Sequence, residues 1–208
     1  MGKRNERRRQ KTLARQKAKR KTVKEVNQSF SSTFGGSISL DSQAPIYECK
    51  IPKRLFEMGI GNIVFSRQFP SGKIGVAVFL LDVFCLGVKD VFHHVVDPNK
   101  YAQIIEGLAR NEPLESIDQA CARKLIEGAV EYAQRFNLRP HPDYKAAQKI
   151  FGDVDTAACP RSFEYGHDGK PFYVAGPNDT PGRSRQVMSV LEKQCGPDGF
   201  HYMVGFEL

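Results

Sequence analysis

Six side chains with acid–base, nucleophilic or metal-binding potential fall within thirteen consecutive residues of this chain. They are Asp82, Cys85, Lys89, Asp90, His93 and His94. A helix here would place four polar side chains on one face, at i, i+3, i+4 and i+7. Their oxygen and imidazole ligands could then bind a metal ion. The four would be Asp90, His93, His94 and Asp97. The neighbouring valines instead favour a strand, in which His93 and His94 point to opposite faces. We therefore expect no metal site.

A metal-dependent nuclease is the main alternative that this stretch allows. In that hypothesis Asp82, Asp90 and His94 form the catalytic group, with Mg²⁺ held by carboxylates at a phosphate. However, Asp82 lies in an apolar run, where an isolated carboxylate is costly unless it is paired. A partner such as Lys89 or a backbone N–H would make Asp82 structural. We favour that structural role, expect no cofactor, and lean away from an enzyme.

Two other segments could bind an anion. His141 lies between Pro140 and Pro142, in a rigid polar loop of a kind that often carries binding residues. Residues 176–182 precede a predicted helix with Arg183 near its start, and a helix N-terminus with a guanidinium can hold a phosphate. Neither segment matches a nucleotide-binding motif. The favoured roles are a spacer between helices and a turn capped by an aspartate.

The cysteines show no pattern of a metal or catalytic site. They are Cys49, Cys85, Cys121, Cys159 and Cys195. The sequence contains no CxxC pair, which argues against a thiolate zinc site. Cys85 could act as a nucleophile with His93 or His94 as its base, but its apolar neighbours predict burial. We expect reduced, partly buried thiols in a cytosolic protein.

The charge of the N-terminus is the strongest chemical signal. Of the 31 Lys and Arg residues, twelve fall in the first 24 positions beside one acid, which leaves nineteen bases and 22 acids in the rest of the chain. The twelve are Lys3, Arg4, Arg7, Arg8, Arg9, Lys11, Arg15, Lys17, Lys19, Arg20, Lys21 and Lys24. A cationic arm on a near-neutral body is typical of proteins that bind RNA or DNA. Crowded like charges disfavour an isolated helix, so we expect residues 1–26 to be a disordered nucleic-acid-binding arm.

The remaining sequence divides into a linker and one domain. Residues 27–45 are polar and rich in Gly and Ser, as in a flexible linker, and residues 46–208 are long enough for a single domain with a core. No run of eighteen apolar residues occurs, so no membrane span is expected. The basic start lacks the apolar segment of a secretory signal. We expect a cytoplasmic protein.

The elements that would position these side chains begin with strands. Apolar, β-branched segments predict strands over 46–51, 62–68 and 73–81. The last two are joined by Phe69-Pro70-Ser71-Gly72, a turn of hairpin type. The third strand runs on through an apolar stretch to Val96, and Gly87 is expected to break it by a bulge or bend.

Helices and a second β section follow. Helical spacing predicts helices over 98–110, 116–136 and 142–151. Ser116 and Gln119 fit a capping box, and Asn137 fits a left-handed C-cap. The Asp-Gly turn at 166–169 predicts a hairpin of residues 161–165 with 171–175, followed by a helix over 183–194 and a strand over 201–207. This order predicts an α+β fold with a mostly antiparallel sheet and a central helical section.

Four segments resemble a family of conserved, functionally uncharacterised small bacterial proteins. They are IYEC at 46–49, LDVFCLGVKD at 81–90, GAVEYAQRFNLRPHPDY at 128–144 and GKPFYVAGPND at 169–179. The resemblance implies a bacterial, cytosolic protein with one compact domain and often a basic N-terminal part. It implies no activity, cofactor or catalytic residue.

These features predict a nucleic-acid-binding protein, with RNA or the ribosome as the favoured partner and DNA as a second possibility. The arm would bind phosphates without distinguishing bases, and the body would dock by its shape. The alternative is the nuclease described above. A membrane-surface adaptor ranks last, because the arm has no apolar face or lipid to stabilise attachment.

Overall fold

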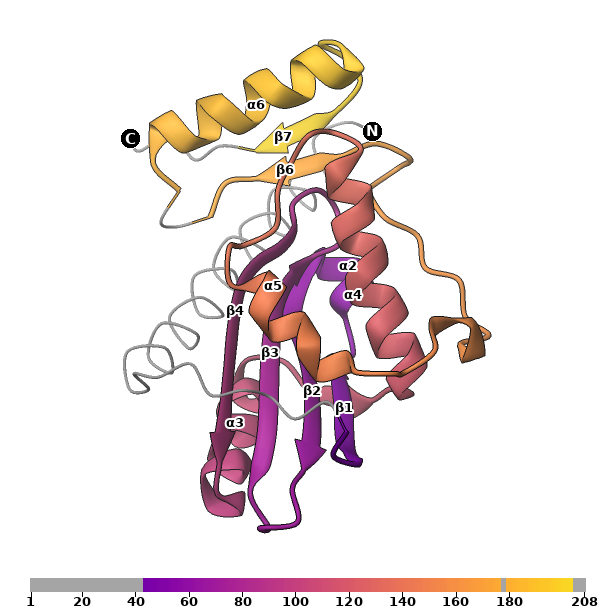
Figure 1. Ribbon diagram of the computed structural model, residues 1–208. Coiled ribbons are helices and arrows are strands. Elements are labelled where there is room, and N and C mark those ends of the chain that lie inside the picture. Colours follow the sequence, from indigo (N-terminus) through magenta and orange to yellow (C-terminus); the bar gives the residue numbers. More distant parts are fainter. Residues whose placement is uncertain (1–42, 177–178, 204–208) are drawn as a thin grey trace, which may run out of the picture.

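A five-stranded antiparallel sheet forms the centre of the computed structural model, which describes residues 43–176 and 179–203 (Figure 1). The strands lie in the order β4-β3-β2-β1-β5. They are β1 Ile46–Pro52, β2 Ile60–Gln68, β3 Ile74–Asp82, β4 Gly87–Val96 and β5 Leu114–Ser116. The predicted α+β class is thus confirmed. The predicted arm, most of the linker and the end of the predicted strand 201–207 lie outside the described residues.

The hairpin of β2 and β3 follows from its turn. Gly72 has a φ of 77°, a conformation that glycine adopts without steric cost. Its N–H donates to the Phe69 carbonyl, and the Phe69 N–H donates to the Lys73 carbonyl. The two strands then pair in register from Ile60 opposite Asp82 to Gln68 opposite Ile74. The hairpin prediction is confirmed.

The long apolar run after β3 reverses direction instead of continuing. Residues 83–86 form a turn, and β4 returns antiparallel to β3. An Asp82 carboxylate oxygen accepts hydrogen bonds from the N–H groups of Phe84 and Cys85, both at 3.0 Å. Gly87 follows with a φ of 63°. The break at Gly87 was therefore expected, whereas the complete reversal was not.

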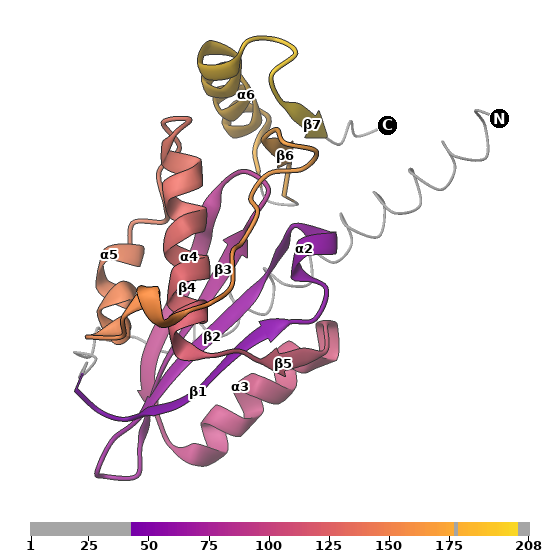
Figure 2. The same ribbon diagram turned by 90° about the vertical axis from the view of Figure 1, so that its right-hand side faces the viewer.

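Helices cover both faces of this sheet (Figure 2). Helix α3, Pro98–Asn111, packs on one face through Ile104 and Leu108. Helix α4, Gln119–Gln134, packs on the other through Leu125 and Ile126. The short helices α5 and η1 lie beside α4, while α2 and η2 are short connecting turns. Their bounds are α2 Leu55–Met58, α5 Tyr144–Ala147, η1 Gln148–Phe151 and η2 Thr156–Ala158.

Helix α4 begins later than the sequence indicated. Ser116 belongs to β5, so the predicted capping box with Gln119 is wrong. Asp118 is the N-cap, and its carboxylate accepts hydrogen bonds from the N–H groups of Ala120 and Cys121 at 2.8 and 3.3 Å. At the C-terminal end, Asn137 adopts the predicted left-handed conformation with a φ of 57°, although the helix ends two residues earlier than predicted, at Gln134, with Arg135 as its C-cap.

The chain closes with a small βαβ unit above the sheet (Figure 1). Strand β6, Phe172–Val174, pairs in parallel with β7, His201–Met203, and α6, Pro181–Cys195, connects them. The predicted hairpin of residues 161–165 with 171–175 is therefore wrong. Its Asp-Gly turn does form, with hydrogen bonds between His167 and Lys170 in both directions, but residues 161–165 pair with no strand.

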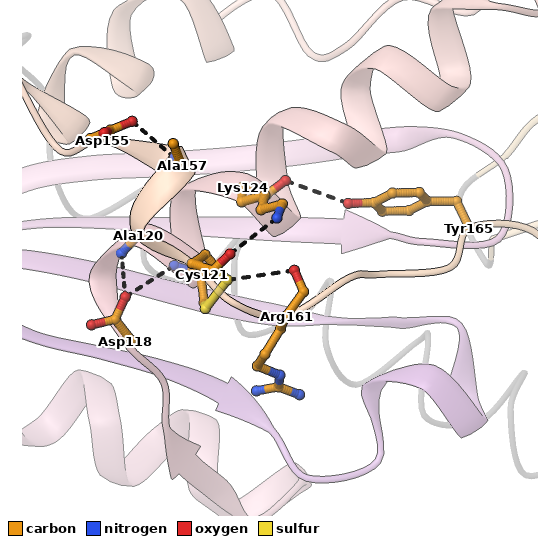
Figure 3. The surroundings of a disulfide bond; sticks show 9 residues. Asp118, Ala120, Cys121, Lys124, Asp155, Ala157, Arg161 and Tyr165 are labelled. Carbon is orange, nitrogen blue, oxygen red and sulfur yellow. Dashed lines mark hydrogen bonds between the residues drawn. A yellow bond between two sulfur atoms is a disulfide. The ribbon is translucent and has the colours of Figure 1, made fainter.

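A disulfide joins Cys121 of α4 to Cys159 after η2 (Figure 3). This corrects the prediction of fully reduced thiols. Hydrogen bonds support the same junction, since the Lys124 ammonium donates to the Cys159 carbonyl at 3.2 Å. The Tyr165 hydroxyl donates to the Leu125 carbonyl at 3.1 Å. The segment after η1 is thereby fastened along α4.

A candidate anion-binding cleft

The three residues of the nuclease hypothesis are spread along β3 and β4. Asp90 lies opposite Leu80 and His94 opposite Val76, whereas Asp82 ends β3. At about 3.3 Å per residue, His94 and Asp82 are roughly 20 Å apart along the sheet. Among the described residues, no group of three His, Cys, Asp or Glu side chains could hold a metal ion. The structure therefore does not assemble the predicted catalytic group.

Asp82 instead stabilises the β3–β4 turn. Its side chain is buried, where a carboxylate requires hydrogen-bond donors, and two backbone N–H groups supply them to one of its oxygens, Oδ1. This is the structural role that the sequence favoured, with a backbone partner. Asp90 likewise accepts a hydrogen bond from the Val91 N–H at 2.9 Å.

A cleft of about 420 Å³ lies where β4, the loop after α4 and α6 meet. The residues that could carry positive charge come from all three elements. They are Lys89, Arg139, His141 and Arg183. The cleft thus joins the His141 loop and the Arg183 helix, two segments that lie far apart in the sequence.

A β-bulge turns Lys89 toward this cleft. Leu80 pairs with Asp90 and Leu81 with Val88, so Lys89 is the extra residue of the β4 strand. A bulge of this kind redirects a side chain. The Lys89 ammonium lies 3.7 Å from the Asp179 carboxylate, across the junction between the sheet and the βαβ unit.

The Asp179 carboxylate is buried and lies against two cations of the cleft, Lys89 and Arg183. Its side chain is 5% exposed, and it also lies 3.4 Å from the Arg183 guanidinium. The N–H of Gly176 donates to it at 2.6 Å and the Tyr173 hydroxyl at 3.3 Å. Burial raises the pKa of Tyr173 to about 12, which keeps this hydroxyl protonated as a donor. Asp179 therefore pairs with both the largely buried Lys89 and the exposed Arg183.

The predicted aspartate cap at this turn is Asp179, although Thr180 caps the helix itself. The Thr180 hydroxyl accepts a hydrogen bond from the Arg183 N–H at 3.2 Å. Asp179 holds the preceding turn through Gly176. The two residues together orient the first turn of α6 and its guanidinium.

The opposite rim of the cleft is formed by the loop after α4. The His141 N–H donates to the Val88 carbonyl at 2.9 Å, which attaches the loop to the edge of β4. The His141 imidazole lies between the carboxylates of Asp90 and Asp143, at 3.9 and 3.7 Å. Arg139 is exposed and has no hydrogen bond or ion pair among the described residues. Arg139 is thus available to a ligand.

A second cleft, of about 450 Å³, lies at the other end of α4 and is acidic. Its lining includes Asp118, Asp153 and Asp155 together with the buried Arg67. The Asp155 carboxylate accepts a hydrogen bond from the Ala157 N–H at 2.9 Å. Asp118 and Asp155 therefore serve as caps of local backbone turns.

Sequence reasoning did not predict the cationic cleft as one site. Lys89, Arg139 and Arg183 are separated by about fifty and forty residues, and no local spacing connects them. The available signals were the two prolines beside His141 and the segment 176–182 that leads into α6. The bulge at Lys89, which completes the set, has no sequence signature that we recognise.

Comparison with family models, curated proteins and solved structures gives no match to this chain. The resemblance to uncharacterised bacterial proteins stays a prediction. Within the described ranges, none of the helices has the length and apolar composition needed to cross a bilayer.

Proposed function

We propose that this protein binds RNA, with the N-terminal arm as its main contact and the cationic cleft as a contact on the folded part. The observation that carries the proposal is the charge distribution: twelve of the 31 basic residues lie in the first 24 positions. Such a concentration attracts a polyanion by releasing its condensed counterions. The cleft adds cations that come from three elements of the fold.

The arm and the cleft are expected to contribute differently to RNA binding, because their chemistry differs. An arm of Lys and Arg binds phosphates of any sequence, so it supplies affinity. Lys89 is held by Asp179 with its side chain largely buried, so the cleft supplies position. A ribosome, which presents dense structured RNA, is the partner that we favour. DNA is the competing polyanion.

The cytoplasm is the compartment that we propose, because RNA and ribosomes are found there. Disulfides are typical of oxidising compartments, so the Cys121–Cys159 bond stands against this proposal. Thiol labelling of the protein in intact cells decides the matter. A reduced pair supports the cytoplasm, and an oxidised pair contradicts it.

The salt dependence of binding tests the proposed function. If roughly six to ten basic residues of the arm contact phosphates, the affinity for RNA falls about 10³–10⁵-fold between 50 and 200 mM salt. Deleting residues 1–24 should remove most of this slope. Scrambling the order of the arm should preserve it, because charge density rather than a motif makes the contact. An unchanged slope after deletion would show that the arm is incidental.

A smaller change to the arm calibrates the same measurement. Replacing Arg7, Arg8 and Arg9 with Ala should lower the logarithmic slope by about two to three, at roughly 0.9 per phosphate on a duplex and 0.7 on a single strand. Crosslinking in cells, followed by sequencing of the bound RNA, then identifies the partner. Recovery of DNA alone would contradict the proposal.

A further inference from the structure

We propose that the cationic cleft binds one nucleotide unit that carries a terminal phosphate, rather than a continuous stretch of backbone. This inference rests on the proposed function for the source of that nucleotide, and it specifies what the same cleft accepts. Its basis is the size of the cleft, its charge and its apolar wall.

The volume of the cleft suits a small molecule. At about 420 Å³, it falls within the range of roughly 300–1,000 Å³ that is typical of ligand sites. A nucleic-acid backbone, by contrast, is usually followed by an extended positively charged groove. A concave site of this size accommodates one end of a chain or a free nucleotide.

The charge of the cleft suits a phosphate monoester. Lys89, Arg139 and Arg183 line it, and one buried carboxylate, that of Asp179, lies against two of them. These four groups together carry two positive charges. A terminal phosphate carries about −1.5 to −2 at neutral pH, whereas an internal phosphodiester carries one negative charge. The monoester is therefore the better match.

Two further acidic groups limit where that phosphate can lie. Asp90 and Asp143 flank the His141 imidazole on its own side of the rim, so that side is not cationic. The phosphate is expected beside Arg139, Lys89 and Arg183. Lys89 is held against Asp179 with its side chain largely buried, which reduces the ordering that binding requires.

The rest of the cleft suits a base and a ribose. Apolar side chains form much of its wall and offer a surface against which a base can lie. They are Leu86, Val88, Leu138, Val187 and Val190. Two amides, those of Asn137 and Gln186, line the same space and can both donate and accept hydrogen bonds with a base edge. Inorganic phosphate would leave this surface unused.

Calorimetric titration of the full chain at 200 mM salt tests the inference. The ligands are each of the four ribonucleoside 5′-monophosphates, the matching nucleosides and inorganic phosphate. At least one monophosphate should bind about tenfold or more tightly than its nucleoside and than phosphate. No monophosphate binding, or equal binding of inorganic phosphate, would overturn the inference.

Matched arginine variants locate the binding. Arg139→Gln and Arg183→Gln should each weaken monophosphate binding about tenfold, the usual effect of losing a hydrogen bond to a charged group. Arg185→Gln, an exposed position on α6 whose side chain donates to the Pro181 carbonyl, should leave it unchanged. An equal loss in Arg185→Gln would show unspecific attraction and overturn the site. Circular dichroism verifies that each variant is folded.

Two RNA oligomers of identical sequence distinguish the sources of the nucleotide. Tighter binding of the 5′-phosphorylated oligomer than of the 5′-hydroxyl oligomer assigns the cleft to an RNA end. Equal binding of the two, with monophosphate binding intact, assigns it to a free nucleotide. If the cleft binds no nucleotide, the salt dependence of RNA binding through the arm is unaffected. The two proposals can therefore be rejected independently of each other.

Discussion

The two clefts at the ends of α4 have similar volumes and opposite charge, and they differ in what their charged groups already do. Helix α4 has sixteen residues and so spans about 24 Å. At its start, Asp118 is engaged by two backbone N–H groups, and Arg67 donates to the carbonyls of Ala44, Ile150 and Phe151. Beyond its end, Arg139 has no such partner among the described residues.

This difference shows that the sign of the charge in a cleft does not by itself define a binding site. A charged group whose hydrogen bonds are satisfied within the chain stabilises the fold, and a ligand would have to displace those bonds. Arg139 needs no such displacement. Lys89 and Arg183 both lie against one carboxylate, that of Asp179.

The largest expected effect contrasts two arginines. Arg67→Ala should lower the free energy of unfolding by about 3 kcal/mol or more, because three buried carbonyls lose a charged donor and a cavity is left. Arg139→Ala should change it by less than about 0.5 kcal/mol, as is usual for surface positions. Urea denaturation measures both values. Similar losses in the two variants would remove the distinction between the clefts.

Loss of the disulfide is expected to have the next largest effect on stability. The disulfide lies at the start of α4, beside the acidic cleft. Replacing Cys121 and Cys159 with Ser should cost about 2–4 kcal/mol, since the bond closes a loop of 38 residues in the unfolded chain. Ala158, beside Cys159, lines the acidic cleft. Neither cysteine lines the cationic cleft, so anion binding there should persist.

Reduction of the native protein checks this result without mutation. Dithiothreitol should lower the melting temperature of the native chain and leave that of the double serine variant unchanged. An unchanged melting temperature of the native chain would indicate that the pair is not bonded in solution.

A smaller effect separates two aspartates of the acidic cleft. Asp118→Ala removes the N-cap of α4 and should cost about 1 kcal/mol, within a usual range of roughly 0.5–2. Asp153→Ala is the matched control, because Asp153 has no hydrogen bond or ion pair among the described residues. It should change stability by less than about 0.5 kcal/mol. An equal loss of stability in the two variants would mean that helix capping is not what Asp118 contributes to the acidic cleft.

The sequence predicted the elements better than their partners. The β2–β3 hairpin, α3 and the end of α4 depend on local signals, such as the Gly72 turn and the left-handed Asn137, and these were predicted. The Asp-Gly turn at 168–169 also formed. The segments on either side of this turn do not pair as a hairpin, because Tyr165 binds a carbonyl of α4 and β6 pairs with β7. No local sequence pattern encodes these contacts.

The absence of local signals for contacts between distant segments also explains why the candidate sites were not predicted correctly. Asp82, Asp90 and His94 are close in the sequence, but an extended hairpin separates them. Cys121 and Cys159 meet because residues 144–160 fold back along α4, and their sequence contexts gave no indication of it. Chemistry assembled from distant segments therefore had to be found in the structure.

The smallest expected effect is a pH dependence that comes from β4 and from neither cleft. Burial lowers the pKa of His93 below its ordinary 6.5, with Asp143 opposing the shift. Burial and the neighbouring His93 lower the pKa of His94. Since the unfolded chain then takes up protons first, stability is complete above about 6.5 and decreases as the pH falls toward the lower folded pKa values.

Thermal melting at pH 8 and pH 5.5 measures this contribution. The native chain should melt at a lower temperature at pH 5.5, and the variant carrying His93→Gln and His94→Gln should lose less of its melting temperature over the same interval. Both imidazoles are partly exposed, so solvent keeps the difference small. An identical decrease in both proteins would show that His93 and His94 do not cause the pH dependence.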